Sequence, residues 1–302
     1  MQQIINEINR LKKEKNAIIL AHNYQLPEVQ DVADFIGDSL GLAQKASKVD
    51  ASIIVLCGVY FMAETAKIIN PDKKVLIPDP GAGCPLAAFA DKKTVLEWRK
   101  RYPEAAFVAY VNSTADVKAV VDICCTSSNA LQVVASLPQK QVVFLPDKNL
   151  GSYVKSKIKD KEIILWPGFC IVHENVEVED VLEVKKIYPD ALVMVHPECR
   201  EEVRALADSI CSTGQMFDFV EHHKDVKRFI VVTEWGINYA LKRRFLEKEF
   251  IEPKRRMECQ NMKKITLKKI LNSLENEYFE VKIDRETIEK ARIPIEKMLT
   301  VG

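Results

Sequence analysis

The sequence predicts an α/β protein in which three similar units, each with a parallel sheet, pack around a pseudo-threefold axis. Two observations predict this fold. The chain repeats itself at offsets of 86 and 88 residues, and continuous apolar runs alternate with helical stretches inside each repeat. Continuous apolar runs are typical of strands that are buried on both faces of a parallel sheet.

The repeat is visible by direct alignment of the chain with itself. Tyr102-Pro103-Glu104-Ala105 matches Tyr188-Pro189-Asp190-Ala191 at an offset of 86, and an offset of 88 places His22 on Tyr110 and Ser39 on Ser127. The period is longer than that of solenoid repeats, so each copy is predicted to be a small domain. Units of this size bury too little surface to be stable alone, and the three are expected to share their inner faces.

Each predicted unit contains three apolar runs separated by helical stretches. The leading runs are residues 18–21, 107–109 and 192–195; the second runs are 53–56, 142–145 and 229–232; the third runs are 75–77, 163–165 and 250–251. The predicted units are residues 1–84, completed by 260–302, then 85–170 and 171–259. The tail is expected to form a helix over 266–276, a strand over 278–283 and a final helix, and to return to the first unit.

Length, composition and charge exclude several classes of protein. A hydrophobic content of 47%, a charged content of 29% and a net charge of +1 describe an ordinary globular protein. No apolar run approaches the roughly 18 residues that a membrane span needs, and the first residues lack the layout of a secretory signal. A cytoplasmic protein with no nucleic-acid and no membrane partner is expected.

Eight cysteines are many for the cytoplasm, where disulfides are rare, so they indicate metal binding or catalysis. Cys84, Cys170 and Cys259 each follow the third apolar run of a unit and lie 86 and 89 residues apart. Three thiolates that meet at the axis would hold an iron–sulfur cluster and leave one iron open to substrate. Zinc remains chemically possible, although its ligands usually come in close pairs. The other five are interpreted as structural: Cys57, Cys124, Cys125, Cys199 and Cys211.

Polar residues follow the leading run of every unit at the same two positions. The pairs are His22 with Tyr24, Tyr110 with Asn112, and His196 with Glu198. Alternate residues of an extended strand face the same side, and open α/β sheets bind ligands at the carboxyl ends of their strands. A single pair is equally well explained by strand-end capping, but three pairs in phase with three cysteines predict a binding site.

A hydroxyl residue precedes a helical stretch in each repeat, at Ser39, Ser127 and Thr213. Each is expected to be the N-cap of its helix, and three helix starts on one axis would also bind an anionic substrate. His173 follows Cys170 by three residues and is expected to donate a hydrogen bond to substrate rather than to be a metal ligand.

Other motifs have weaker support. Gly37-Asp38-Ser39-Leu40 spells the GDSL motif of serine esterases, but the Asp-x-x-His that activates such a serine does not occur. The basic tripeptides Lys242-Arg243-Arg244 and Lys254-Arg255-Arg256 lie among glutamates, which favours a solvated face. No Walker loop and no GxGxxG is present.

The chain resembles the quinolinate synthase family, the A protein of de novo NAD biosynthesis, nearly from end to end. The stretches that carry the resemblance include Ala21-His22-Asn23-Tyr24-Gln25, Gly37-Asp38-Ser39-Leu40, Gly58-Val59-Tyr60-Phe61-Met62-Ala63-Glu64, Tyr110-Val111-Asn112-Ser113-Thr114, Pro146-Asp147-Lys148-Asn149-Leu150-Gly151, Gly168-Phe169-Cys170-Ile171-Val172-His173, His196-Pro197-Glu198-Cys199, Ser212-Thr213-Gly214-Gln215-Met216 and Asn261-Met262-Lys263. The resemblance implies three similar αβα sandwich domains around a pseudo-threefold axis.

The resemblance also implies a reaction, a cofactor and a set of site residues. The reaction condenses iminoaspartate (iminosuccinate) with dihydroxyacetone phosphate to quinolinate, phosphate and two waters. One [4Fe-4S] cluster per chain, held by Cys84, Cys170 and Cys259, would act as a Lewis acid. Glu198, assisted by Tyr24 and Tyr110, is expected to transfer protons. The expected substrate-binding residues are His22, Ser39, Tyr110, Val111, Asn112, Ser127, His173, His196, Pro197, Glu198 and Thr213. An upstream aspartate oxidase or dehydrogenase is implied as the source of the imine.

Two alternatives remain open from the residues. One is a different [4Fe-4S] hydro-lyase that acts on another hydroxy acid. The other is an iron–sulfur sensor that binds nucleic acid through the two basic tripeptides, with affinity that falls as salt rises.

Overall fold

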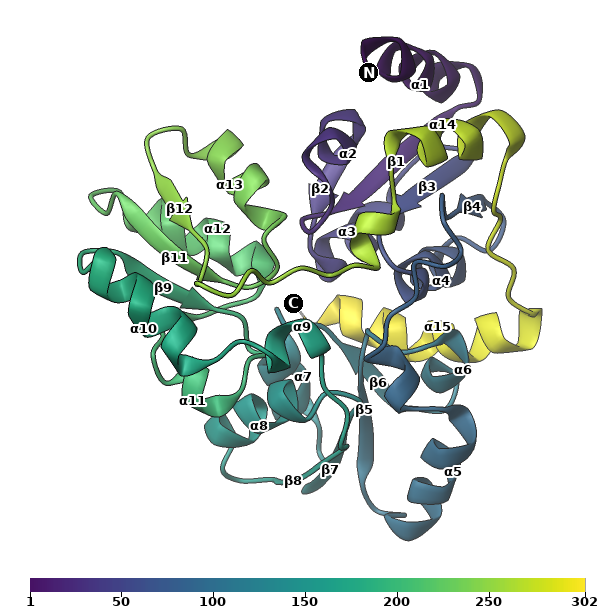
Figure 1. Cartoon of the computed structure of the whole chain (residues 1–302). Helices are drawn as coiled ribbons and strands as arrows, with labels where there is room; N and C mark the ends of the chain where they lie inside the picture. The colour runs from purple at the N-terminus through teal and green to yellow at the C-terminus, as the bar shows by residue number, and fades with distance from the viewer. Residues whose placement is uncertain (302) are drawn as a thin grey trace.

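The computed structural model describes residues 1–301 and contains three four-stranded parallel sheets, arranged with their helices around a common centre (Figure 1). The predicted α/β fold of three similar units with parallel sheets is confirmed. Each sheet lies within one of the predicted residue ranges, since the strands cover residues 17–76, 106–165 and 192–251. Within residues 1–301, no helix combines the length and the apolar character that crossing a bilayer requires.

The first unit begins with an amphipathic helix that buries Ile8 and Leu11. Its strands are β1 (Ala17–His22), β2 (Phe35–Gly37), β3 (Ile53–Cys57) and β4 (Lys74–Leu76). Its helices are α1 (Gln2–Glu14), α2 (Pro27–Val32), α3 (Ser39–Ala46) and α4 (Tyr60–Ile69). The strand order is β2-β1-β3-β4, so the two buried apolar runs form the middle of the sheet.

The second unit repeats this order as β6-β5-β7-β8. Its strands are β5 (Ala106–Tyr110), β6 (Ile123–Cys125), β7 (Gln141–Leu145) and β8 (Glu162–Leu165). Its helices are η1 (Ala87–Phe89), α5 (Lys92–Arg101), α6 (Ala115–Lys118), α7 (Ala130–Ser136) and α8 (Lys148–Lys157). Helices α5, α6 and α8 are capped by Asp91, Thr114 and Asp147, respectively. The side chain of each cap accepts a backbone N–H of the first turn.

The third unit has the order β10-β9-β11-β12. Its strands are β9 (Leu192–Val195), β10 (Ser209–Ile210), β11 (Arg228–Val232) and β12 (Glu249–Ile251). Its helices are α9 (Ile171–Glu174), α10 (Val178–Ile187), α11 (Glu201–Arg204), α12 (Thr213–His222) and α13 (Ile237–Arg244). A capping box of Ser212 and Gln215 starts α12, and one of Glu177 and Asp180 starts α10.

The structure adds a short edge strand to each unit that the sequence did not predict: β2, β6 and β10. These strands have only two or three residues, too few to show a hydrophobic pattern. An aspartate precedes each one and accepts the backbone N–H of the leading strand at 2.7–2.8 Å; the pairs are Asp34 with Ile19, Asp122 with Phe107, and Asp208 with Val193. The repeated aspartate therefore fixes the edge strand against its neighbour.

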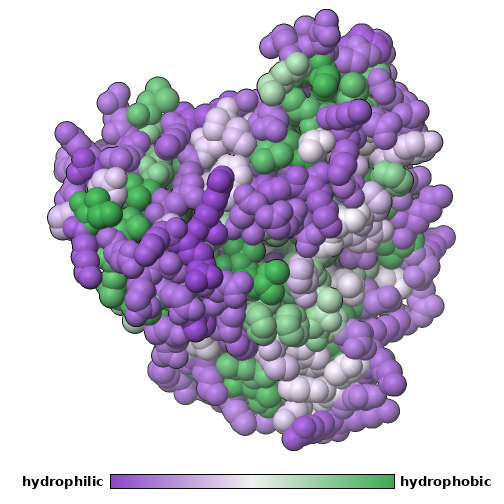
Figure 2. All heavy atoms as spheres, in the orientation of Figure 1, coloured by the Kyte–Doolittle hydropathy of each residue, from purple (hydrophilic) through white to green (hydrophobic). Residues whose placement is uncertain are grey.

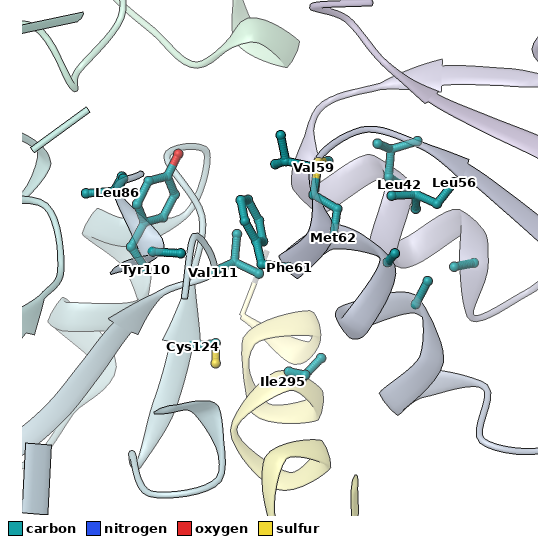
Figure 3. Packing of buried hydrophobic residues seen from close by; sticks show 14 of the residues in the cluster. Leu42, Leu56, Val59, Phe61, Met62, Leu86, Tyr110, Val111, Cys124 and Ile295 are labelled. Atoms are coloured by element: carbon teal, nitrogen blue, oxygen red, sulfur yellow. The ribbon is translucent and has the colours of Figure 1, made fainter. Parts of the chain in front are cut away.

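Buried apolar side chains form one large cluster that joins the first and second units and reaches into the third, with a smaller cluster inside the third unit. Figure 3 shows Phe61 of α4 between Val59 and Met62 on one side and Tyr110 and Val111 of the second unit on the other. The units thus share their inner faces. On the face drawn in Figure 2, hydrophilic side chains cover most of the surface, and apolar ones gather in a smaller area below its centre.

The C-terminal tail differs from the prediction in two ways. It consists of η2 (Met262–Lys264), α14 (Leu267–Asn276) and α15 (Arg285–Thr300). The expected strand over 278–283 forms only an isolated antiparallel bridge between Leu76 and Glu280, beside β4. Helix α14 packs on α1, but α15 packs on α6 and β6 of the second unit as well as on α4. The side-chain amide of Asn129 donates to the carbonyls of Met298 and Val301 at 3.1 Å, which holds the end of α15.

Candidate active site and metal centre

The three units contribute side chains to one cavity. All but two of the site residues expected from the sequence line this cavity. Those that do are His22, Tyr24, Ser39, Cys84, Tyr110, Asn112, Ser127, Cys170, His173, His196, Glu198, Thr213 and Cys259. Val111 borders a smaller cavity beside Ser39 and Phe61, and Pro197 borders a separate one beside Ser127. These two residues therefore do not line the main cavity.

The cysteines of the cavity come from the three loops that follow β4, β8 and β12. All three are free thiols. Burial raises the pKa of Cys84 to about 12 and the pKa of Cys170 well above its usual range, and the nearby Cys259 raises both pKa values further. The protonated thiols must lose their protons to bind a metal, so metal binding here releases protons. The other five described cysteines do not line this cavity.

His173 and Glu198 are in close polar contact in the cavity. Nδ1 of His173 lies 2.7 Å from Oε2 of Glu198 and 3.2 Å from Sγ of Cys170. Burial alone would raise the pKa of Glu198, but His173 outweighs burial and lowers it. One ligand atom from each of Cys170, His173 and Glu198 lies within 4.8 Å of the other two. A thiol, an imidazole and a carboxylate at this spacing are suited to a metal cofactor.

Two tyrosines extend this network as hydrogen-bond donors. The hydroxyl of Tyr110 donates to Glu198. The hydroxyl of Tyr24 lies 2.5 Å from Oγ1 of Thr233, which also lies 2.8 Å from Nε2 of His173. Burial and then the charge of Glu198 raise the pKa of both phenols well above their usual value, so both keep their protons at neutral pH.

His22 and His196 occupy equivalent positions in the first and third units and are held in the same way. The N–H of Tyr24 donates to Nδ1 of His22 at 3.1 Å, and the N–H of Glu198 donates to Nδ1 of His196 at 3.3 Å. Burial lowers the pKa of His22 to about 4 and that of His196 to about 3. Both rings are therefore neutral at pH 7, with the proton on Nε2.

The three hydroxyl residues line the cavity, but none of them is the N-cap of its helix, so this expectation was wrong. Asp38 caps α3 and Ser212 caps α12, which makes Ser39 and Thr213 the first helical residues. Ser127 lies ahead of Asn129, the residue before α7. Capping by the preceding residue leaves both hydroxyls out of the helix N–H bonds, and Oγ1 of Thr213 accepts the side-chain amide of Asn23 at 3.2 Å.

Sequence reasoning missed several lining residues: Asp38, Val59, Phe61, Met62, Val172, Glu234 and Met262. The apolar ones are indistinguishable from core residues in a sequence. Glu234 carried a usable signal, because it follows Asp147 by 87 residues, in phase with the repeat. Its carboxylate is fully buried and pairs with Nζ of Lys263 at 2.8 Å.

The two basic tripeptides are largely paired with carboxylates on the surface. Arg243 lies 3.0 Å from Asp31, Arg244 lies 2.5 Å from Glu221, and Lys254 lies 2.7 Å from Glu183. Arg255 and Arg256 also have acidic neighbours. These cations therefore do not form a strip of uncompensated positive charge.

Comparison with known proteins adds an independent line of support. The family model described as "Quinolinate synthetase A protein" matches residues 6–300. The chain is 51% identical to "Quinolinate synthase" of Aquifex aeolicus, over 100% of this chain and 95% of the relative. It is 48% identical to the protein of the same name from Caldicellulosiruptor saccharolyticus, over 100% and 99%. It is 52% identical to that from Dehalococcoides mccartyi strain CBDB1, over 99% and 98%.

Proposed function

The chain belongs to the quinolinate synthetase A protein family of NAD-biosynthetic enzymes, and we propose that it condenses iminoaspartate with dihydroxyacetone phosphate to give quinolinate, phosphate and two waters. The observation that carries this proposal is the shared cavity. Three free cysteines from three units line it together with the Glu198, His173 and Tyr110 network.

The residues of the cavity fit a [4Fe-4S] cluster, with Cys84, Cys170 and Cys259 as its ligands. The fit rests on the donor set: three half-buried free thiols on separate loops, in one cavity that the other five described cysteines do not line. Thiolates are the usual ligands of such clusters, and three of them leave one iron without a cysteine. When bound, the cluster supplies a Lewis acid for a substrate oxygen.

The cavity also fits the charge of the substrates. Iminoaspartate carries two carboxylates and dihydroxyacetone phosphate carries a phosphate. Three hydroxyl residues near helix starts, Ser39, Ser127 and Thr213, line the cavity from three units. Hydroxyls and free helix N–H groups bind anions. We assign one anionic group of the substrates to each unit.

Proton transfers are assigned to the buried network. Glu198 is ionised at neutral pH, because His173 lowers its pKa, so it begins the reaction as a base. Tyr110 donates to that carboxylate and orients it. Tyr24, which keeps its proton because burial raises the pKa of its hydroxyl, shares Thr233 as a partner with His173 beside the base. Neutral His22 and His196 present Nε2–H as hydrogen-bond donors to substrate oxygens.

The imine substrate requires a nearby source. Iminoaspartate hydrolyses readily in water, so an aspartate oxidase or dehydrogenase must supply it. The buried cavity, whose histidines and carboxylate are almost fully shielded from solvent, would protect the imine once it is bound.

The test is anaerobic purification followed by iron and sulfide analysis and a product assay. The expected result is about four irons and four sulfides per chain, together with quinolinate from the two named substrates. A cluster-loaded protein that forms no quinolinate would favour the alternative hydro-lyase. Salt-sensitive binding of nucleic acid would favour the sensor, against which the paired basic tripeptides argue.

A further inference from the structure

We propose that Asp147 and Glu234 are positioning residues that hold the loops carrying Cys170 and Cys259, and that the first unit lacks this device because Val59 occupies the corresponding position. The three residues are related by the repeat, since Asp147 follows Val59 by 88 residues and Glu234 follows Asp147 by 87.

A backbone hydrogen bond to each cysteine loop recurs in all three units. In each unit, the residue that follows Val59, Asp147 or Glu234 donates its backbone N–H. The acceptor is the carbonyl of the residue two positions before the cysteine of that unit. The pairs are Tyr60 to Ala82 at 2.8 Å, Lys148 to Gly168 at 2.7 Å, and Trp235 to Met257 at 2.9 Å. The segments approach closely, since a Cβ on Gly168 would lie 2.5 Å from the carbonyl oxygen of Pro146.

In two units a buried carboxylate adds a second connection. Oδ2 of Asp147 accepts the N–H of Cys170 at 3.2 Å, while Oδ1 accepts the N–H of Asn149 at 2.8 Å. Oε1 of Glu234 accepts the N–H of Cys259 at 3.1 Å, while Oε2 accepts the N–H of Gly236 at 2.8 Å. Each carboxylate therefore ties the backbone of a cysteine to the segment that leads into the next helix.

Both carboxylates are fully buried, so a backbone N–H that loses its bond to either of them has no water to take its place. The Glu234 connection is reinforced by Lys263, which contacts the carboxylate at 2.8 Å and donates its backbone N–H to the carbonyl of Cys259 at 3.2 Å. Lys263 thus contacts both the carboxylate that accepts the N–H of Cys259 and the carbonyl of Cys259 itself.

The first unit departs from this pattern. Val59 is buried and lines the cavity, but its apolar side chain accepts no hydrogen bond. At this position the Cys84 loop has the backbone bond from Tyr60 but no carboxylate. Its side-chain contacts, from Lys264 to the carbonyl of Gly81 at 2.6 Å and from the N–H of Gly81 to Asp79 at 2.7 Å, lie at least three residues before the cysteine. We therefore expect the Cys84 loop to open more readily than the other two. In loaded protein this makes Cys84 the first ligand to be released, a consequence that rests on the proposed cluster.

The experiment measures amide hydrogen exchange and iodoacetamide labelling of the eight-cysteine chain without metal, under anaerobic conditions. In Asp147→Asn, one amide oxygen still accepts the helix N–H, but an NH₂ group now faces the N–H of Cys170. The Cys170 amide is expected to exchange roughly tenfold faster, with the Cys259 amide unchanged, because its hydrogen bond to residue 147 is lost. Glu234→Gln is expected to give the reverse pattern.

Asp208→Asn is the matched control, because that carboxylate also accepts a backbone N–H, from Val193 at 2.7 Å, but at the amino end of its sheet. It is expected to lower global stability and to leave the ratio of the Cys170 and Cys259 exchange rates unchanged. Unaltered exchange at both cysteines in the two test variants, or equal acceleration in the control, would overturn the proposal.

The unsubstituted chain provides a measurement that does not depend on variant folding. Its Cys84 amide is expected to exchange faster, and its Cys84 thiol to be labelled faster, than those of Cys170 and Cys259. Equal rates at the three cysteines would contradict the role of the carboxylates. Failure to bind a cluster would contradict the proposed function instead and would leave these rates interpretable.

Discussion

Nδ1 of His173 lies 2.7 Å from Oε2 of Glu198, and both side chains are buried at the point where the three units meet. The two residues come from different elements of the third unit: His173 lies in α9, beside Cys170, and Glu198 follows β9. Their contact joins a cysteine loop to the end of a leading strand. It therefore places a base beside the predicted metal centre.

Glu198→Gln is predicted to slow turnover without loss of the cluster. The amide keeps the shape and the contact with Tyr110 but is no base, so kcat should fall by about 10²- to 10⁴-fold. Steady-state kinetics and the iron content of the same preparation test this. An unchanged kcat would assign the proton transfer to another group.

Cys170→Ser is predicted to abolish both cluster binding and activity, because it removes one of only three thiolate ligands. Iron and sulfide analysis with visible absorbance measures the first effect, and quinolinate formation the second. Cys124→Ala is the control, since Cys124 is a buried free thiol that does not line the cavity. Full activity of Cys170→Ser would remove that residue from the ligand set.

The two buried histidines predict a dependence of stability on pH. Their pKa values fall from 6.5 to about 4 for His22 and about 3 for His196 in the folded state. Below pH 6.5 the unfolded chain takes up protons that the folded chain does not, so stability present above pH 6.5 is lost as pH falls towards 4. Each histidine should contribute about 1.4 kcal/mol per pH unit in this window.

Urea unfolding of the metal-free chain at pH 7 and pH 5 measures this dependence. His22→Gln should lose about 2 kcal/mol less than the unsubstituted chain between the two pH values. His222→Gln, at an exposed histidine, should behave like the unsubstituted chain. Identical losses in all three proteins would show that His22 accepts its proton in the folded state.

Phe61→Ala is predicted to lower the free energy of unfolding by about 3–5 kcal/mol. The substitution removes the ring that packs between α4 and the second unit and leaves a cavity there. Leu246→Ala, at a side chain that is 83% exposed, should change it by less than about 0.5 kcal/mol. Denaturant unfolding of the metal-free chain compares the two. A small loss for Phe61→Ala would mean that the interface repacks around the missing ring.

The central strands were predictable because each is a continuous apolar run, and the repeat then placed the polar residues that follow them. The edge strands were not predictable, because they are too short to show a hydrophobic pattern. Strand β10, for example, consists of Ser209 and Ile210 alone. The cap of α3 is Asp38 and not Ser39, because a carboxylate beside a hydroxyl can satisfy the same helix N–H groups.

The same reasoning explains the site. His22, Tyr110 and His196 could be found because three equivalent strand ends meet at one axis. Phe61 and Met262 could not, since an apolar residue that lines a cavity has the same composition and spacing as one that fills a core. The position of α15 against the second unit depends on tertiary contacts that no local pattern reports.

The placement of α15 bears on the order in which the protein matures. The last turns of this helix receive the amide of Asn129, close to Ser127 of the cavity, and the third cysteine is at position 259. A chain that has been synthesised only as far as residue 258 contains neither the third thiol nor the helix that packs on the first two units. A cluster held by the three thiols, as we propose, could therefore be completed only after these C-terminal segments have been made.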